Sequence, residues 1–235
     1  MLGSLSEDDS LGAVTCKLLS ADEKHIDSTG DFYSTWGLTI SRQRDKKAED
    51  AIGNEEKVFG ACAGASLYRM DMFNEVGLFD EDFFAYYEDS DLNFRMQLAG
   101  WKILYNPKAI AYHATGSTGN KIKGFTAYQT FKNFPLLFWK NMPLRLLIHT
   151  LPRFTFVYVI IFLNSFAKGN GLAAVKGLLR MLTLLPKKLV ERRKIQKNRK
   201  VSVSYINSIL VHDLPPNATN LRKLRAFFSP GRSND

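Results

Sequence analysis

Apolar runs alternate with long polar stretches in the first 120 residues. Residues 11–19 are apolar after an acidic turn and predict a buried strand, whereas residues 20–56 are polar and predict loops. Residues 58–68 are small and apolar, which indicates a strand that another backbone or a ligand approaches closely. Two further short strands are expected at 102–105 and 109–113, on either side of a turn.

Helical spacing occurs between these strands. Residues 70–76 predict a short helix that ends at Gly77. Residues 89–99 predict a longer one, because apolar side chains recur there at spacings of four and three, and Gly100 follows where a helix-ending glycine belongs. Strands and helices that alternate in this way indicate an α/β fold.

After residue 120 the apolar positions lie much closer together. The longest uncharged run, residues 154–167, has 14 residues, whereas a helix that spans a bilayer needs about 20. We expect this segment to lie in the membrane interface, or to form one marginal span over about residues 151–168. The pattern divides the chain into an α/β portion (1–120), a helical, amphipathic, membrane-associating region (121–205) and a basic polar tail (206–235).

Charge is distributed unevenly between these parts. Residues 1–120 carry 11 Lys/Arg and 20 Asp/Glu, whereas residues 121–235 carry 21 and 3. Basic side chains beside an apolar face attract anionic lipid headgroups, by about 1 kcal/mol per residue near the surface. A solvated helix face or a nucleic-acid patch has a similar composition, but the acidic first half argues against nucleic acid as a partner. The residues expected to contact an anionic membrane are Lys187, Lys188, Arg192, Arg193 and Lys197.

Two features bear on the compartment. Cys16 and Cys62 have neither the spacing of a metal site nor that of a disulfide framework, which suits a reducing environment. Residues 1–9 are polar and acidic and lack the features of a signal peptide. The expected location is therefore the cytoplasmic face of the cell membrane.

Residues 79–92 combine carboxylates and aromatic side chains densely, with six of the former and five of the latter. Apolar walls shift the pKa values of carboxylates, and a general base needs a carboxylate that is ionised and aimed at a substrate. Glu88, Asp89 and Asp91 fall in the first turn of the expected helix, where the macrodipole favours ionised forms, although acidic residues are common in any first turn. Asp91 and Arg95, four residues apart, are expected to form a structural pair.

Several short motifs follow one another in a fixed order. They are Phe59-Gly60-Ala61-Cys62-Ala63-Gly64-Ala65, Val76-Gly77-Leu78-Phe79-Asp80-Glu81-Asp82-Phe83, Tyr87-Glu88-Asp89-Ser90-Asp91-Leu92, Ala99-Gly100-Trp101 and Tyr112-His113. Over about residues 11–113 the chain therefore resembles the second half of the family-2 glycosyltransferases, especially their rhamnosyltransferase-like branch. The resemblance implies a GT-A fold, in which a mixed α/β sheet binds a nucleotide-sugar in its first half and the acceptor in its second.

The resemblance also implies roles for individual residues. Asp89 matches the family's general base, which takes the proton from an acceptor hydroxyl as that oxygen attacks the anomeric carbon with inversion. Glu88 would help to position the acceptor or the base. His113 matches a position where several members have a ligand to a divalent metal, Mn²⁺ rather than Mg²⁺ for an imidazole, although a lone histidine is often structural.

Other residues of these motifs are expected at the substrate cleft. A small or aromatic side chain there would line the donor or acceptor site, although packing explains all of them as an alternative and explains the tryptophan better than a role in the cleft. The expected lining residues are Gly60, Ala61, Gly64, Asp91 and Trp101.

One part of the family pattern is not found. Members carry a nucleotide-binding unit that ends in an Asp-x-Asp motif, and only ten residues precede Leu11 here. Asp80-Glu81-Asp82 and Asp89-Ser90-Asp91 have the spacing, but neither follows an apolar strand. We therefore expect a truncated member, or one that depends on a second polypeptide for the nucleotide-binding half.

The expected function is transfer of a sugar from a nucleotide-sugar donor to a lipid-linked or polysaccharide acceptor, in cell-envelope polysaccharide biosynthesis. The alternative is a non-catalytic, membrane-associated partner or subunit of a split glycosyltransferase that retains the acceptor-binding surface.

Overall fold

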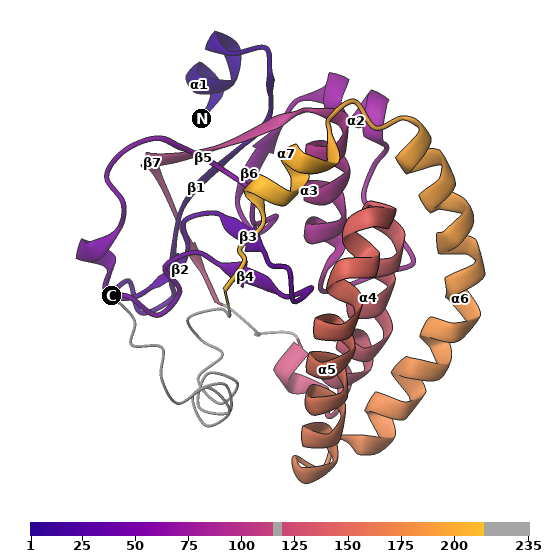
Figure 1. Ribbon diagram of the computed structural model, residues 1–235. Coiled ribbons are helices and arrows are strands. Elements are labelled where there is room, and N and C mark those ends of the chain that lie inside the picture. The colour runs from indigo at the N-terminus through magenta and orange to yellow at the C-terminus, as the bar shows by residue number, and fades with distance from the viewer. Residues whose placement is uncertain (115–118, 214–235) are drawn as a thin grey trace, which may run out of the picture.

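The computed structural model describes residues 1–114 and 119–213. The strands gather on one side of the molecule, and three long helices stand together on the other (Figure 1). A mixed sheet followed by helices confirms the expected α/β class.

The sheet has five strands around a parallel pair. β1 (Leu11–Ser20) and β7 (Lys102–His113) run parallel at its centre. β5 (Glu56–Val58) pairs antiparallel with the other edge of β7. β6 (Ser66–Tyr68) and β2 (Ile26–Ser28) pair antiparallel with the two ends of β1. Because β1 has neighbours along both edges and is buried almost throughout, its sequence is a continuous apolar run rather than an alternating one.

A separate hairpin extends the sheet toward the helices. It consists of β3 (Asp31–Tyr33) and β4 (Thr39–Ser41). The Asp31 amide donates to the Gly60 carbonyl at 2.8 Å, and the Gly60 amide donates to the Asp31 carbonyl at 3.0 Å. The hairpin is thereby attached to the loop that follows β5.

Two strand predictions were wrong in their extent. Residues 58–68 form the end of β5, a loop and then β6 rather than one strand. Conversely, 102–105 and 109–113 belong to the single strand β7. The register between β1 and β7 shifts beyond Cys16, so Asn106 and Pro107 are accommodated as an irregularity within the strand instead of a turn.

Helices make up most of the rest of the described chain. α3 begins one residue before its expected start and ends at Gly100, whose φ of 92° is the left-handed conformation that glycine adopts without strain. α2 lies where it was predicted. The helices are α1 (Leu2–Glu7), α2 (Met70–Val76), α3 (Glu88–Ala99), α4 (Phe125–Asn141), α5 (Leu144–Ala167), α6 (Gly171–Lys197) and α7 (Val203–Ile209), with short 3-10 turns at Ala48–Asp50 and Gly119–Lys121.

One hydrophobic core joins the sheet to the helical region. Phe59 and Phe94, from the α/β portion, pack in the same buried cluster as Phe134 and Phe138 of α4 and Ile206 of α7. The helices after residue 120 are therefore packed against the α/β portion through shared apolar side chains.

A buried network of charges links α3, α4 and α6. Asp91 is fully buried, and its Oδ2 lies 2.9 Å from both Arg95 Nε and Lys140 Nζ. Lys140 and Lys188 both bind Asp80. Burial acts to raise the pKa of Asp80, but the charges and hydrogen bonds of these two lysines hold it well below its usual range.

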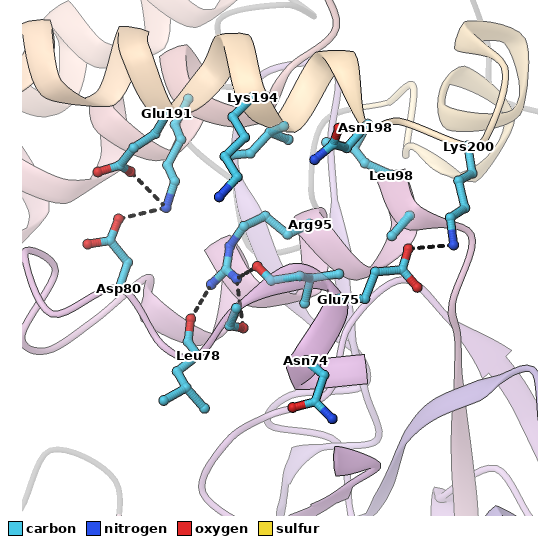
Figure 2. A pocket seen from close by; sticks show the side chains of 15 residues that line it. Asn74, Glu75, Leu78, Asp80, Arg95, Leu98, Glu191, Lys194, Asn198 and Lys200 are labelled. Carbon is cyan, nitrogen blue, oxygen red and sulfur yellow. Dashed lines mark hydrogen bonds and ion pairs between the residues drawn. The ribbon is translucent and has the colours of Figure 1, made fainter. Parts of the chain in front are cut away.

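A cavity of about 800 Å³ lies beside this network, between α2, α3 and α6 (Figure 2). Arg95 extends along its wall and donates to the carbonyls of Val76 (2.6 Å), Gly77 (3.0 Å) and Leu78 (2.9 Å). Lys200 pairs with Glu75 at 2.6 Å on the same wall. These contacts fix the segment between α2 and α3, which leads to the candidate site.

Candidate active site

A cleft of about 810 Å³ lies between the β3–β4 hairpin, the loop after β5, the segment before α3 and the start of α4. Carboxylates, hydroxyls, a thiol and a histidine face it together with aromatic rings. The polar and aromatic groups that matter most are Asp31, Arg44, Cys62, Phe84, Glu88, Asp89 and His113. The cleft therefore brings together Glu88, Asp89 and His113, which the sequence placed in the site.

The segment before α3 has an unusual backbone. Phe84, Tyr86 and Tyr87 have φ values of 61°, 63° and 71°, in the left-handed region that bulky residues rarely adopt. Asn133 of α4 holds this conformation, because its Nδ2 donates to the carbonyls of Phe83 (2.9 Å), Ala85 (2.9 Å) and Tyr86 (2.8 Å). The segment therefore delivers the first turn of α3 to the cleft in one fixed geometry.

Asp89 lines the cleft from the first turn of α3 and is partly buried. Its Oδ1 accepts from the Ser90 amide at 2.7 Å, and its Oδ2 accepts from the Ala63 amide at 3.4 Å. Burial raises the pKa of Asp89, whereas these hydrogen bonds act in the opposite direction. A carboxylate with a raised pKa is a stronger base than an exposed one, provided that it is ionised at the working pH.

Glu88 is the neighbouring acid of the same cleft. Burial, and then the negative charge of Asp89, raise the pKa of Glu88 to about 7. Its Oε2 is buried and has no hydrogen-bond partner among the described residues. A buried carboxyl oxygen without a donor is costly to ionise, which agrees with burial as the main cause of the raised pKa of Glu88.

His113 ends β7 at the rim of the cleft. Its Nδ1 lies 2.8 Å from Asp27 Oδ2, and Asp27 also pairs with Arg44 at 3.1 Å. A carboxylate on one ring nitrogen fixes the orientation and tautomer of an imidazole, as it does for histidines that bind metals. Within the described chain, however, no third His, Cys, Asp or Glu ligand gathers with His113. His113 could therefore supply one oriented ligand to a metal, but the described residues around it do not form a complete metal site.

Sequence reasoning missed Asp31, which lies beside Asp89. Ligand atoms of Asp31, Cys62 and Asp89 all lie within 4.8 Å of one another. Burial, and then the charges of the two aspartates, raise the pKa of the Cys62 thiol to about 12, so that it stays protonated at neutral pH. The polar stretch that contains Asp31 has no periodicity that distinguishes this residue from its neighbours.

Two of the residues expected to line the cleft, Gly60 and Ala61, pack against α3 instead. Among the described residues that line the cleft, Gly64 is present but Gly60 and Ala61 are not. Both main-chain groups of Ala61 bind the Asn93 side chain, at 3.1 and 2.9 Å. A Cβ at Gly60 would come within 2.6 Å of Asn93 Nδ2, so only glycine allows this loop to pack on α3.

Asp91 and Trp101 are also displaced from the cleft. Asp91 is the centre of the buried charge network, and its ion pair with Arg95 has the expected structural geometry. Trp101 packs against the cluster that contains Met72 and Met96, where the sequence allowed packing as the alternative. The expectation that these two residues line the cleft is corrected, because both side chains point into the interior.

The expected membrane-contact residues divide into two groups. Lys188 is fully buried and pairs with Asp80, Asp82 and Glu191, so its assignment to the membrane surface is wrong. Lys187 pairs with Asp82 but remains largely exposed. Arg192 donates to the Trp139 carbonyl at 2.8 Å, whereas Arg193 and Lys197 are exposed.

Comparison with known proteins relates this chain to a glycosyltransferase. Over 85 residues it is 36% identical to the N-acetylglucosaminyl-diphospho-decaprenol L-rhamnosyltransferase of Mycobacterium tuberculosis, in both strain CDC 1551 / Oshkosh and strain ATCC 25618 / H37Rv. The match covers 36% of this chain and 26% of each relative, so the chain spans about a quarter of the length of these proteins. No protein-family model matches the chain.

The arrangement of the cleft suits proton transfer to a carboxylate. Asp89 is held by two main-chain donors, and the cleft around it is large enough for a sugar unit. The thiol of Cys62 is protonated, so it is not a proton acceptor at neutral pH.

Proposed function

We propose that this protein is the acceptor-side portion of an inverting glycosyltransferase of GT-A type. It transfers a sugar from a nucleotide-sugar to a lipid-linked or polysaccharide acceptor. The observation that carries the proposal is the position of Asp89, a partly buried carboxylate that lines an 810 Å³ cleft and is held by the amides of Ser90 and Ala63. The mycobacterial relatives, whose name states transfer of L-rhamnose to a lipid-linked diphospho-sugar, support the reaction class.

Asp89 acts as the general base in this proposal. It accepts the proton of an acceptor hydroxyl while the oxygen attacks the anomeric carbon, and the nucleoside diphosphate leaves from the opposite face. The configuration inverts in this single displacement. Glu88, whose pKa is raised to about 7 by burial and by the charge of Asp89, donates a hydrogen bond to a neighbouring hydroxyl of the acceptor or accepts one from it.

A divalent metal, Mn²⁺ in preference to Mg²⁺, is part of the proposal. His113 would be one ligand, oriented by Asp27, and the metal would neutralise charge on a leaving diphosphate when bound. The Asp80, Asp82 and Glu191 carboxylates also lie close together, but Lys188 binds all three and leaves no need for a cation there.

The proposed location is a membrane surface, with α5 and α6 against the lipid. α5 is the one helix in the described ranges with the length and composition to cross a membrane. Its outer face presents Ile148, Phe156, Leu163 and Phe166, all exposed. A peripheral orientation suits it better than a span, because Pro152 and two arginines interrupt the apolar run.

The end of the molecule near α5 is also the end that holds the cleft. A Cβ at Gly124, which precedes α4, would come within 2.8 Å of Ala173 in the first turn of α6. Phe125 and Thr126, the next residues of α4, line the cleft. Apolar contact with lipid at the α5–α6 turn would therefore bring the cleft toward membrane-bound acceptors.

The proposal is tested by incubating the protein with a nucleotide-diphospho-sugar, a polyprenyl-diphospho-sugar acceptor and Mn²⁺, and by analysing the product by mass spectrometry. Appearance of an extended lipid-linked glycan is the expected result. If the protein binds the acceptor but transfers no sugar from any of the donors, the catalytic role is refuted. That result would support the alternative function, a non-catalytic partner that binds the acceptor. Absence of both binding and transfer would refute the acceptor site itself.

A further inference from the structure

Asp31 and Asp89 come from distant parts of the chain and meet in the cleft. Asp31 begins β3, and its main chain pairs in both directions with Gly60. Cys62 follows two residues later, and the Ala63 amide binds Asp89. One loop therefore places the two aspartates together, with a carboxyl oxygen of each and Cys62 Sγ within 4.8 Å of one another.

Two carboxyl groups at this separation in a partly buried site do not ionise independently. The first proton lost leaves a negative charge that resists the loss of the second, so the pair titrates as a unit. Burial, and then the charge of Asp89, raise the pKa of Asp31 to about 7. Burial also raises the pKa of Asp89.

The other groups that face the pair come from β2, β4, β6, α3 and the loops after β4 and β5. Arg44, beyond β4, and the hydroxyls of Ser28 and Ser41 act to lower the pKa of Asp31. Glu88 of α3 adds an acidic neighbour that itself is raised to a pKa of about 7. Cys62 and the Tyr68 hydroxyl of β6 remain protonated, because burial and the nearby carboxylates raise the pKa values of both. Arg44 also pairs with Asp27, which in turn binds His113 at the rim of the cleft. One arginine therefore faces four carboxyl groups, which favours retention of a proton.

We propose that Asp31 is a positioning residue that shares one proton with Asp89 and thereby sets the pH at which Asp89 is ionised. This inference rests on the proposed role of Asp89 as the base. When the proton resides on Asp31, Asp89 is ionised and can accept the acceptor's hydroxyl proton. The new glycosidic C–O bond forms as the bond from the anomeric carbon to the nucleoside diphosphate breaks, with its electron pair leaving on the diphosphate. The pair then holds two protons, and one returns to solvent.

The first test is a carboxyl ¹³C NMR titration of the labelled protein, with Asp31 and Asp89 assigned from the Asp31→Asn and Asp89→Asn variants. We expect two coupled steps in the wild type. In Asp31→Asn we expect one step for Asp89, with a midpoint lower by roughly one pH unit, since the neighbouring charge is removed. Asp45→Asn, an exposed aspartate in the loop after β4, is the matched control and should leave both midpoints unchanged. An unchanged Asp89 midpoint in Asp31→Asn would overturn the proposal.

Ser28→Ala tests the same pair without removing a charge. Its hydroxyl donates to Asp31 Oδ1 at 3.1 Å, which stabilises the ionised form. Loss of that hydrogen bond should raise the upper midpoint of the pair, and a fall would contradict the proposal. This variant also keeps the inference testable if Asp31→Asn does not fold.

The pH dependence of sugar transfer separates the inference from the proposed function. In Asp31→Asn the acid limb of kcat/KM should move to lower pH by the same amount as the Asp89 midpoint. A merely structural role for Asp31 would lower the rate at every pH and leave the limb in place, which would overturn the inference alone. Coupled NMR titration in a protein that transfers no sugar would instead refute the proposed function and leave the shared proton established.

Discussion

Replacing Asp91 by asparagine removes the negative charge at the centre of the network between α3, α4 and α6. The side chain is fully buried, and its Oδ2 contacts Arg95 Nε and Lys140 Nζ, both at 2.9 Å. Its Oδ1 accepts from Asn141 Nδ2 at 2.7 Å. Burial acts to raise the pKa of Asp91, but Arg95 and Lys140 lower it overall, so the group is ionised in the folded protein.

The magnitude follows from what remains after the substitution. At an effective dielectric constant of about 20, each 2.9 Å pair is worth about 6 kcal/mol before desolvation is subtracted. Removal of one partner from a buried ion pair costs about 3–5 kcal/mol, because the other charge stays buried. Lys140 retains Asp80 at 2.6 Å, and Arg95 retains three carbonyl acceptors. We therefore expect the lower end, about 3 kcal/mol, and a fall in Tm of about 6–12 °C for a chain of this size.

Circular dichroism during thermal and urea unfolding measures both quantities. Glu81→Gln is the matched control, since it removes a negative charge from an exposed position in the segment before α3 and should shift Tm by less than about 2 °C. An Asp91→Asn protein as stable as this control would show that the network contributes nothing net, and would refute the structural role assigned to Asp91.

Three further predictions concern pH, the cleft and the membrane. The pKa of Glu88 is about 7 in the folded protein and near 4.5 in the unfolded chain, so the folded protein binds this proton more tightly. The unfolding free energy should therefore fall as the pH rises from about 4.5 to 7. Glu88→Gln should abolish up to about 3 kcal/mol of that fall, measured by urea titrations at several pH values. Asn133→Leu removes the side-chain donor that three carbonyls share, and the Phe83 carbonyl then keeps the Ala85 amide and Lys132 as donors. We expect destabilisation of about 2–4 kcal/mol and loss of acceptor binding in calorimetry; unchanged binding would contradict the clamping role. Arg193→Glu combined with Lys197→Glu should weaken flotation with anionic vesicles and not with neutral ones, whereas equal flotation with both would remove the electrostatic account of α6.

Local sequence pattern was sufficient for the elements that are stabilised locally. β1 is a continuous apolar run because both of its edges are paired, and α3 ends at a glycine because its last residue needs a left-handed conformation. Glu88 and Asp89 were placed in the cleft from their position in the first turn of a helix and from the resemblance. The strand and the helix end needed only residues within one or two turns of each other, whereas the resemblance needed motifs spread over about a hundred residues.

Long-range pairing explains what the sequence did not reveal. Lys188 belongs to a basic stretch that predicts membrane contact, but two of its three acidic partners, Asp80 and Asp82, lie before α3, about a hundred residues earlier. Asp31 lies in a polar stretch without periodicity, and only the main-chain pairing with Gly60 brings it to Asp89. Residues 58–68 likewise leave the sheet between β5 and β6 at the point where the main chain of Ala61 binds Asn93 of α3.

The most direct test of the account is sugar transfer by Asp89→Asn, measured together with its Tm. Because burial raises the pKa of Asp89, removal of its charge should leave Tm unchanged or higher, while loss of the base should reduce kcat by about 10²–10⁴-fold. That result would establish Asp89 as a group that acts in the reaction and not in the fold. Full transfer activity in the folded Asp89→Asn protein would contradict the central claim.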